Sequence, residues 1–111
     1  MTINPEERGQ ATILHLSGEI READEDNFIR TVTERIDRPG ARVVLDMSEI
    51  TYVTSSGLGA IVRVTAQANT QRAKVVIAAP SPFINGVLEI TALNRYFDVY
   101  PTIDDAVTSN N

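Results

Sequence analysis

The sequence predicts an α/β domain with a mixed β-sheet of about five strands and crossover α-helices. Two short runs of mostly β-branched and apolar residues, at 42–47 and 74–79, are typical of strands that are covered on both faces. Segments with apolar residues at helical spacing follow such runs, and this alternation implies parallel central strands. With 111 residues and 42% hydrophobic content, the chain has material for one core, so we expect a single domain over 1–111.

The first third of the chain predicts a hairpin and then a helix. The strand formers at 11–16 follow the turn-like segment 8–10, so they are expected to pair with a short strand around Ile3. The acidic stretch 22–26 suits the positive end of a helix. The helix is expected to continue until Pro39-Gly40 stops it. Its apolar positions are Phe28, Ile29, Val32 and Ile36.

The central part predicts a strand at 42–47, a short loop, and a helix that begins at Ser55 and loosens near 69–71. The expected apolar stripe of that helix consists of Leu58, Ile61, Val62, Thr65 and Ala66. A second buried strand at 74–79 ends at Pro80.

The last third predicts two helices separated by a short edge strand. Ser81-Pro82 is a good helix start, because proline at the first helical position needs no amide partner. The expected inner face of this helix consists of Phe83, Val87, Leu88 and Thr91. An edge strand at 96–100 is followed by a brief helix capped by Thr102, and residues 108–111 are expected to be a disordered tail.

Composition excludes several classes of function. The 15 acidic and 10 basic residues give a net charge of −5, which opposes binding to nucleic acid or to an anionic membrane. The absence of cysteine removes disulfides and thiolate metal sites. The first seven residues lack the basic head and apolar stretch of a secretory signal, and no apolar run approaches the length of a membrane span. We therefore expect a cytoplasmic protein.

The most informative segment joins the central strand to the second helix. Three hydroxyl residues, Thr54, Ser55 and Ser56, stand at the predicted helix start, and Gly57 and Gly59 follow. Small residues let another surface approach the backbone, and hydroxyls can cap free amides. A phosphate on such a hydroxyl would meet the positive end of the helix and change the surface without unfolding the domain. A plain helix cap and a regulated docking surface are both compatible with the pattern.

The run from Asp46 to Ile50, followed by Tyr52-Val53-Thr54-Ser55-Ser56-Gly57-Leu58-Gly59, resembles the signature of bacterial anti-sigma factor antagonists of the STAS domain family. The similarity extends through 16–20, the strand at Lys74 and the helix at Ser81-Pro82. The resemblance implies a protein that binds a GHKL-type anti-sigma factor serine kinase and so frees a sigma factor. It further implies that the kinase phosphorylates a serine of its antagonist and that a PP2C-type phosphatase reverses this.

Transferred to this sequence, the resemblance indicates Ser55 as the phosphorylated serine, with Ser56 and Thr54 as second choices. Two positions depart from the family pattern: Thr54 replaces an aspartate, and Arg21 occupies a position that is commonly acidic. These departures motivate the alternative of a STAS subunit that serves a transporter or a multiprotein scaffold without phosphorylation. The expected partner surface consists of Arg21, Thr54, Ser55, Ser56, Gly57, Leu58 and Gly59.

An enzymatic function is not expected, and neither a cofactor nor a metal is predicted. The single histidine, His15, lies within a strand, where a core or sheet-surface role is expected, and the Gly-x-Ser-x-Gly spacing of a nucleophile elbow is absent. The acidic groups at 22–26 and 104–105 are explained by helix N-termini, and neither has the spacing of a calcium loop. A third hypothesis, hydrolase activity that depends on Ser55, would need chemistry that the sequence does not supply.

Overall fold

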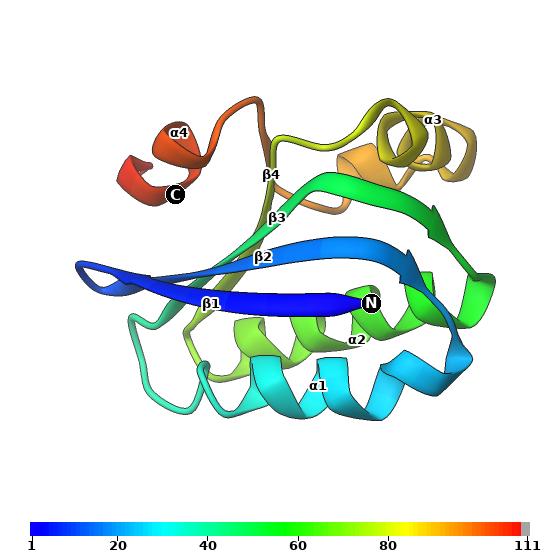
Figure 1. Ribbon diagram of the computed structural model, residues 1–111. Helices are drawn as coiled ribbons and strands as arrows, with labels where there is room; N and C mark the ends of the chain where they lie inside the picture. Colours follow the sequence, from blue (N-terminus) through cyan, green and yellow to red (C-terminus); the bar gives the residue numbers. More distant parts are fainter. Residues whose placement is uncertain (110–111) are drawn as a thin grey trace.

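The computed structural model describes residues 1–109, which form one five-stranded sheet and four α-helices (Figure 1). The strand order is β1-β2-β3-β4-β5; β1 and β2 are antiparallel, and the other neighbours are parallel. The strands are β1 Thr2–Arg8, β2 Ala11–Ile20, β3 Arg42–Val53, β4 Lys74–Ala78 and β5 Val99–Tyr100. The predicted α/β class, opening hairpin and mixed sheet are confirmed.

The helices lie on both sides of the sheet. Figure 1 shows α1 and α2 side by side below the sheet, with α3 and α4 on the other side of the drawing. The helices are α1 Glu25–Thr33, α2 Ser55–Thr70, α3 Pro82–Thr91 and α4 Ile103–Thr108, with short 3₁₀ turns η1 Glu22–Asp24 and η2 Leu93–Arg95. Each parallel pair of β2, β3 and β4 is therefore joined through a helix, as parallel pairing requires.

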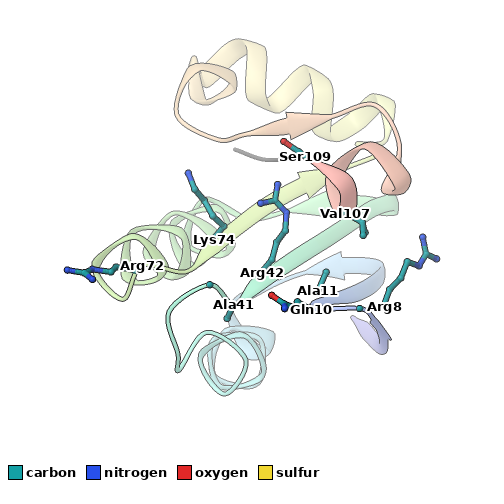
Figure 2. Close-up of a pocket in the computed structure, with 11 residues that line it drawn as sticks. Arg8, Gln10, Ala11, Ala41, Arg42, Arg72, Lys74, Val107 and Ser109 are labelled. Atoms are coloured by element: carbon teal, nitrogen blue, oxygen red, sulfur yellow. The ribbon is translucent and has the colours of Figure 1, made fainter.

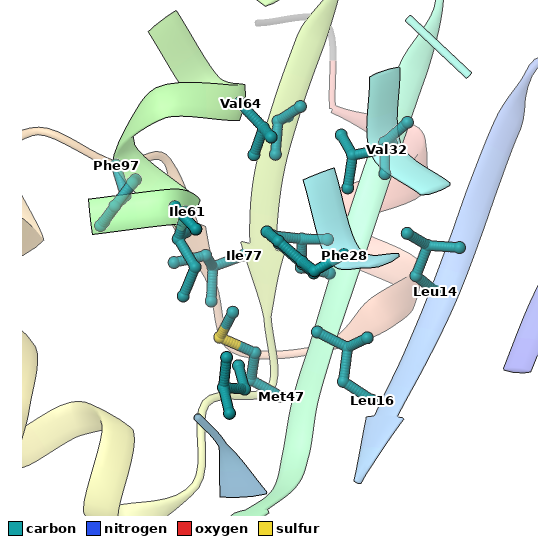
Figure 3. Packing of buried hydrophobic residues seen from close by; sticks show 14 of the residues in the cluster. Leu14, Leu16, Phe28, Val32, Met47, Ile61, Val64, Ile77 and Phe97 are labelled. Carbon is teal, nitrogen blue, oxygen red and sulfur yellow. The ribbon is translucent and has the colours of Figure 1, made fainter. Parts of the chain in front are cut away.

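Side chains of the central strands alternate between the two faces of the sheet, and they form two separate core clusters. Leu14 and Leu45 face α1 and α2, whereas their neighbours Ile13 and Val44 face α4, because successive side chains of a strand point to opposite faces. Figure 3 shows Phe28 of α1 within the larger cluster. The residues of the smaller cluster are Ile13, Val44, Val76, Ala78 and Ala106.

Helix α1 ends at Thr33, so the expectation that it continues to Pro39 is wrong. Ile36 is fully buried but belongs to a turn, in which the amides of Arg35 and Ile36 bond to Val32 and Thr33 at 2.9 and 3.5 Å. Ile36 therefore continues the apolar spacing of α1 in the sequence because it is buried, although its backbone is not helical.

The buried faces of α2 and α3 also differ from the expected stripes. Ala66 of α2 is exposed and Val62 is only half-buried. The buried residues of α2 are Gly57, Ala60, Ile61, Val64, Thr65 and Ala68. In α3 the buried residues are Ile84 and Leu88, while Phe83 and Val87 are half-buried and Thr91 is exposed.

Strand β3 continues to Val53, so the loop expected after Met47 is instead a strand. It keeps its pairing with β2 through two register shifts, at His15/Ser17 and at Gly18/Glu19. The extension is also held by α3, because the Ser81 hydroxyl donates to the carbonyl of Ile50 at 2.7 Å. This continuation was not predicted because polar residues within the strand interrupt the apolar run.

Of the two last elements, β5 is shorter than expected and α4 extends one residue into the expected tail. Strand β5 consists of Val99–Tyr100 rather than 96–100, and Phe97 just before it is buried. Thr102 caps α4, as predicted, by accepting from the amide of Asp105 at 3.1 Å. Thr108 of the expected tail is the last residue of α4, and residues 110–111 lie outside the described part of the chain.

Candidate functional site

The segment Thr54–Gly59 follows the carboxyl end of the central strand β3 and forms the start of α2. Thr54 is the N-cap of α2: its Oγ1 accepts from the amide of Gly57 at 3.0 Å, as the sequence predicts. The amide of Thr54 donates to the carbonyl of Ile20 at 3.0 Å, so the end of β2 fixes the position of the cap. The three hydroxyls thus stand on a rigid junction of two strands and a helix.

The three hydroxyls have different environments. Thr54 is half-buried and occupied by capping, whereas Ser56 donates a short hydrogen bond to the carboxylate of Glu25 in α1. Ser55 is exposed, and within the described residues its hydroxyl makes no hydrogen bond. A phosphate on Ser56 would face the Glu25 carboxylate, and a phosphate on Thr54 would remove the cap. Ser55 is the hydroxyl that can be modified without breaking a contact.

The two glycines of the segment have different roles. Gly57 is buried, and a Cβ there would approach the Ile20 carbonyl and Cγ2 at 3.0 Å and Val53 Cγ2 at 3.1 Å. Gly59 is exposed, and a Cβ there would meet no atom of the described residues within 4 Å. Gly57 therefore allows the helix to approach β2 closely, while Gly59 keeps the outer surface low beside the half-buried Leu58.

Arg21 directly follows β2 and lies next to an aromatic pair. Its guanidinium is 5.0 Å from the ring centroid of Tyr52, within the range of a cation–π contact, and its Nε donates to Glu19 at 2.5 Å. Tyr52 is 40% exposed, and its ring centroid lies 5.8 Å from that of Phe83 in α3. Arg21, Tyr52 and Phe83 therefore form a continuous surface, which we call the Arg–aromatic surface.

His15 does not belong to this site. Its Nδ1 lies 2.6 Å from Asp46 Oδ2, and its Nε2 lies 2.8 Å from Glu6 Oε1. Hydrogen bonds to Glu6 and then to Asp46 raise the pKa of His15, while contacts with His15 and Arg8 lower the pKa of Glu6. Of the two roles expected for His15, in the core or on the sheet surface, the structure shows the second, since both ring nitrogens contact carboxylates of neighbouring strands.

Residues 1–109 contain neither a candidate membrane-spanning helix nor a candidate metal cluster. No helix in this range combines the length and apolarity needed to cross a bilayer. The described histidine, aspartate and glutamate side chains form no cluster of three that could hold a metal ion.

The family model described as the STAS domain matches residues 2–106 of the chain. The chain belongs to the STAS domain family. The match begins with β1 and ends within α4. The segment Thr54–Gly59 is therefore the strand-to-helix junction of a STAS domain.

Named relatives of this STAS domain include antagonists of anti-sigma factors. A putative anti-sigma factor antagonist, BtrV of Bordetella bronchiseptica, is 26% identical over 84 residues, which are 76% of this chain and 72% of BtrV. A crystal structure of an anti-sigma factor antagonist from Mycobacterium paratuberculosis superimposes with a TM-score of 0.82 at 24% identity, and the match covers 96% of this chain and 91% of that one.

Two further structures share the STAS fold. The phosphorylated form of SpoIIAA from Bacillus has a TM-score of 0.71 at 14% identity, and the match covers 96% of each chain. The murine anion transporter Slc26a9 has a TM-score of 0.75 at 17% identity; the match covers 92% of this chain and 18% of the transporter. The same fold thus occurs both as a single small chain and as one part of a much larger membrane protein.

The structure places the predicted site residues at one end of the sheet. Thr54 to Gly59 are contiguous, and Arg21 follows Ile20, whose carbonyl accepts from the Thr54 amide. Sequence reasoning missed Glu25, Tyr52 and Phe83 as neighbours of this surface. Their contacts join residues about 31 positions apart, so no local pattern could have indicated them.

Proposed function

We propose that this STAS domain is an anti-sigma factor antagonist, which docks through the surface around Ser55 on an anti-sigma factor serine kinase of the GHKL type. Docking sequesters the kinase and frees its sigma factor. Phosphorylation of Ser55 ends the interaction, and a PP2C-type phosphatase restores it. The observation that carries the proposal is the exposed Ser55 hydroxyl at the first position of α2, beside two hydroxyls that are already engaged.

The position of Ser55 explains how a phosphate could act on docking alone. The first amides of a helix have no partner within the helix and carry partial positive charge, so the folded domain tolerates a phosphate there. The phosphate adds roughly −1.5 to −2 charges. A partner that covers Ser55 would have to desolvate this charge, which weakens binding while the core remains intact.

Named relatives support this proposal. BtrV and the mycobacterial protein are described as anti-sigma factor antagonists, and a structure of SpoIIAA is known in a phosphorylated form. The environment of the site also favours binding over catalysis. His15 is engaged by Glu6 and Asp46, away from Ser55, so no imidazole is placed to activate the Ser55 hydroxyl.

A second candidate function is that of a STAS interaction subunit of a transporter or multiprotein scaffold, without a phosphorylation cycle. The fold of the STAS region of Slc26a9 favours it, as do Thr54 and Arg21, which depart from the antagonist pattern. Arg21 adds a cation to the Arg–aromatic surface, so a partner with an acidic docking surface would be preferred over a basic one.

The decisive experiment incubates the chain with ATP and a candidate GHKL-type kinase encoded near it, and locates phosphate by mass spectrometry. Ser55→Ala should abolish the modification. Ser56→Ala, the matched control, removes the adjacent hydroxyl and should leave it intact. Phosphate on another residue, or none with a kinase that binds the chain, would contradict the mechanism.

Affinity capture from the source organism separates the two candidate functions. Recovery of a histidine-kinase-like ATPase supports the antagonist, and recovery of a membrane transport protein supports the alternative. Hydrolase activity that is lost in Ser55→Ala would instead indicate an enzyme and contradict both.

A further inference from the structure

Glu25, the first residue of α1, is in contact with the first turn of α2. Its carboxylate accepts a hydrogen bond from the Ser56 hydroxyl, although the two residues are 31 positions apart in the sequence. A carboxylate can only accept, so Ser56 is the donor. Glu25 is half-buried, and it takes part in no ion pair within residues 1–109. A negative charge without a paired cation therefore lies directly beside the Ser56 hydroxyl.

The Ser56 hydroxyl is the middle member of a short chain of hydrogen bonds. Because its proton is donated to Glu25, its oxygen is left to accept from the Thr54 hydroxyl, 3.4 Å away. Thr54 Oγ1 in turn accepts from the amide of Gly57 at 3.0 Å. The chain thus joins the backbone of α2 to the carboxylate of α1, and it occupies the hydroxyl protons of Thr54 and Ser56. Ser55 takes no part in it.

Solvent access alone does not distinguish the two serines, because both Ser55 and Ser56 are exposed. Their directions differ, since successive residues of a helix are rotated by about 100° about its axis. Ser56 is turned toward α1, where Glu25 accepts its proton, and a Cβ on Gly57 would point inward to Ile20 and Val53. The contact with Glu25 is therefore the feature that separates Ser56 from Ser55.

We propose that Glu25 is a specificity-determining residue, which restricts phosphorylation to Ser55 and excludes Ser56. This inference rests on the proposed function, because it concerns which hydroxyl the same kinase modifies. In the transfer, the serine oxygen attacks the γ-phosphorus of ATP, the bond from that phosphorus to the bridging oxygen breaks, ADP leaves, and the hydroxyl proton passes to a base of the kinase. Ser55 can give up its proton directly, whereas Ser56 must first break its bond to Glu25.

Electrostatic repulsion also disfavours Ser56. A phosphate attached to a serine carries roughly −1.5 to −2 charges, and on Ser56 these charges would lie beside the Glu25 carboxylate. The guanidinium of Arg21 does not offset them, because it is paired with Glu19 and lies over the ring of Tyr52.

A second group of basic residues is too far from Ser56 to offset this repulsion. These residues line a pocket at the amino ends of β3 and β4, whereas α2 follows the carboxyl end of β3 (Figure 2). They are Arg8, Arg42, Arg72 and Lys74. The repulsion between Glu25 and a phosphate on Ser56 is therefore not relieved by this pocket.

The test removes Ser55 so that modification of Ser56 can be measured by itself. Ser55→Ala and the double variant Ser55→Ala/Glu25→Gln are incubated with ATP and the candidate kinase, and phosphate is located and quantified over time by mass spectrometry. Glutamine keeps an oxygen that can accept from Ser56 but removes the charge. Phosphorylation of Ser56 should be about tenfold faster in the double variant, because the repulsion is lost. Glu25→Ala in the same background also releases the hydroxyl and should raise the rate further.

Asp26→Asn is the matched control for the change of charge. Asp26 is the next residue of α1, is exposed, and forms no hydrogen bond with the hydroxyls of Thr54–Ser56 within residues 1–109. Ser55→Ala/Asp26→Asn should therefore remain unmodified at Ser56. Urea unfolding of each variant verifies that the domain is folded. An equal gain in the Asp26 variant would show a general effect of charge and would overturn the role of Glu25.

The remaining outcomes separate the role of Glu25 from the proposed function. Phosphate on Ser55 of the wild type, with none on Ser56 in the Glu25 variants, overturns the role of Glu25 and leaves the antagonist function standing. An unmodified wild type, with phosphate on Ser56 after Glu25→Gln, supports the role of Glu25 and contradicts the Ser55 mechanism. Phosphate on Ser56 of the wild type that is lost in Glu25→Gln would show that the carboxylate acts as a base, and it overturns both. The absence of phosphate from every variant, with a kinase that binds the chain, also overturns both.

Discussion

At the scale of single residues, the two glycines of the site provide a matched pair for a stability measurement. Gly57→Ala should destabilise the domain by about 1–3 kcal/mol, because the new Cβ would lie 3.0 Å from the backbone carbonyl of Ile20 and force the helix away from β2. Gly59→Ala should instead stabilise it by about 0.5–1 kcal/mol, because the position is helical and open. Urea unfolding of both variants gives the comparison, and equal effects would contradict the proposed close approach at Gly57.

Residue identity and residue environment were not equally predictable. The sequence places three hydroxyls at a helix start, and the resemblance indicates Ser55 among them. It does not show that Ser56 is bonded to Glu25 in α1, because that contact depends on how two helices pack. The distinction between the exposed and the engaged hydroxyls follows from tertiary structure alone.

At the scale of elements, the N-cap of α2 can be separated from the charge of the site. Thr54→Ala should lose about 1 kcal/mol of unfolding free energy, because the Gly57 amide loses its acceptor. Thr54→Asp should remain about 1 kcal/mol more stable than Thr54→Ala, since an aspartate oxygen caps as well and favours the helix dipole. Urea unfolding measures both. If the two variants were equally unstable, Thr54 would not be acting as a cap.

Predictions of helices and strands were correct where the local sequence pattern agrees with the burial of the residues. They were wrong where the pattern and the burial differ. The apolar runs that became β3 and β4 and the caps at Thr54, Ser81 and Thr102 are local signals, and all appear in the structure. The predicted end of α1 was wrong because Ile36 is buried in a turn and not in the helix. The extension of β3 was not predicted because Ser48 and Glu49 interrupt the apolar run, whereas the pairing with β2 continues beyond them.

At the scale of the whole molecule, a chain of charged contacts crosses the sheet and reaches α4. It runs from buried Asp46 in β3 to His15 in β2, then to Glu6 and Arg8 in β1, and finally to Asp104 in α4. Asp46 is held further by the amide and hydroxyl of Ser48, at 3.1 and 2.9 Å. These contacts join the first three strands of the sheet to the last helix of the chain.

The raised pKa of His15 makes the stability of the domain depend on pH. Hydrogen bonds that the imidazole donates to Glu6 and Asp46 favour its charged form in the folded state, so the folded pKa of His15 lies above the unfolded value of about 6.5. The stabilisation by this charge is therefore complete below about pH 6.5 and is lost as pH rises through the folded pKa. The lowered pKa of Glu6 acts in the opposite sense, since its contribution is lost only as pH falls into the acid range.

Urea unfolding from pH 5.5 to 9 measures this dependence and avoids the range in which Glu6 titrates. The stability of the wild type minus that of His15→Gln should fall across this interval, because glutamine carries no charge at any pH. High salt should reduce the change, since His15 is about one-third exposed and its contacts with Glu6 are partly screened. A difference that is constant with pH would show that the imidazole stays neutral between its two carboxylates, and the charged contacts across β1, β2 and β3 would then contribute no proton-linked stability.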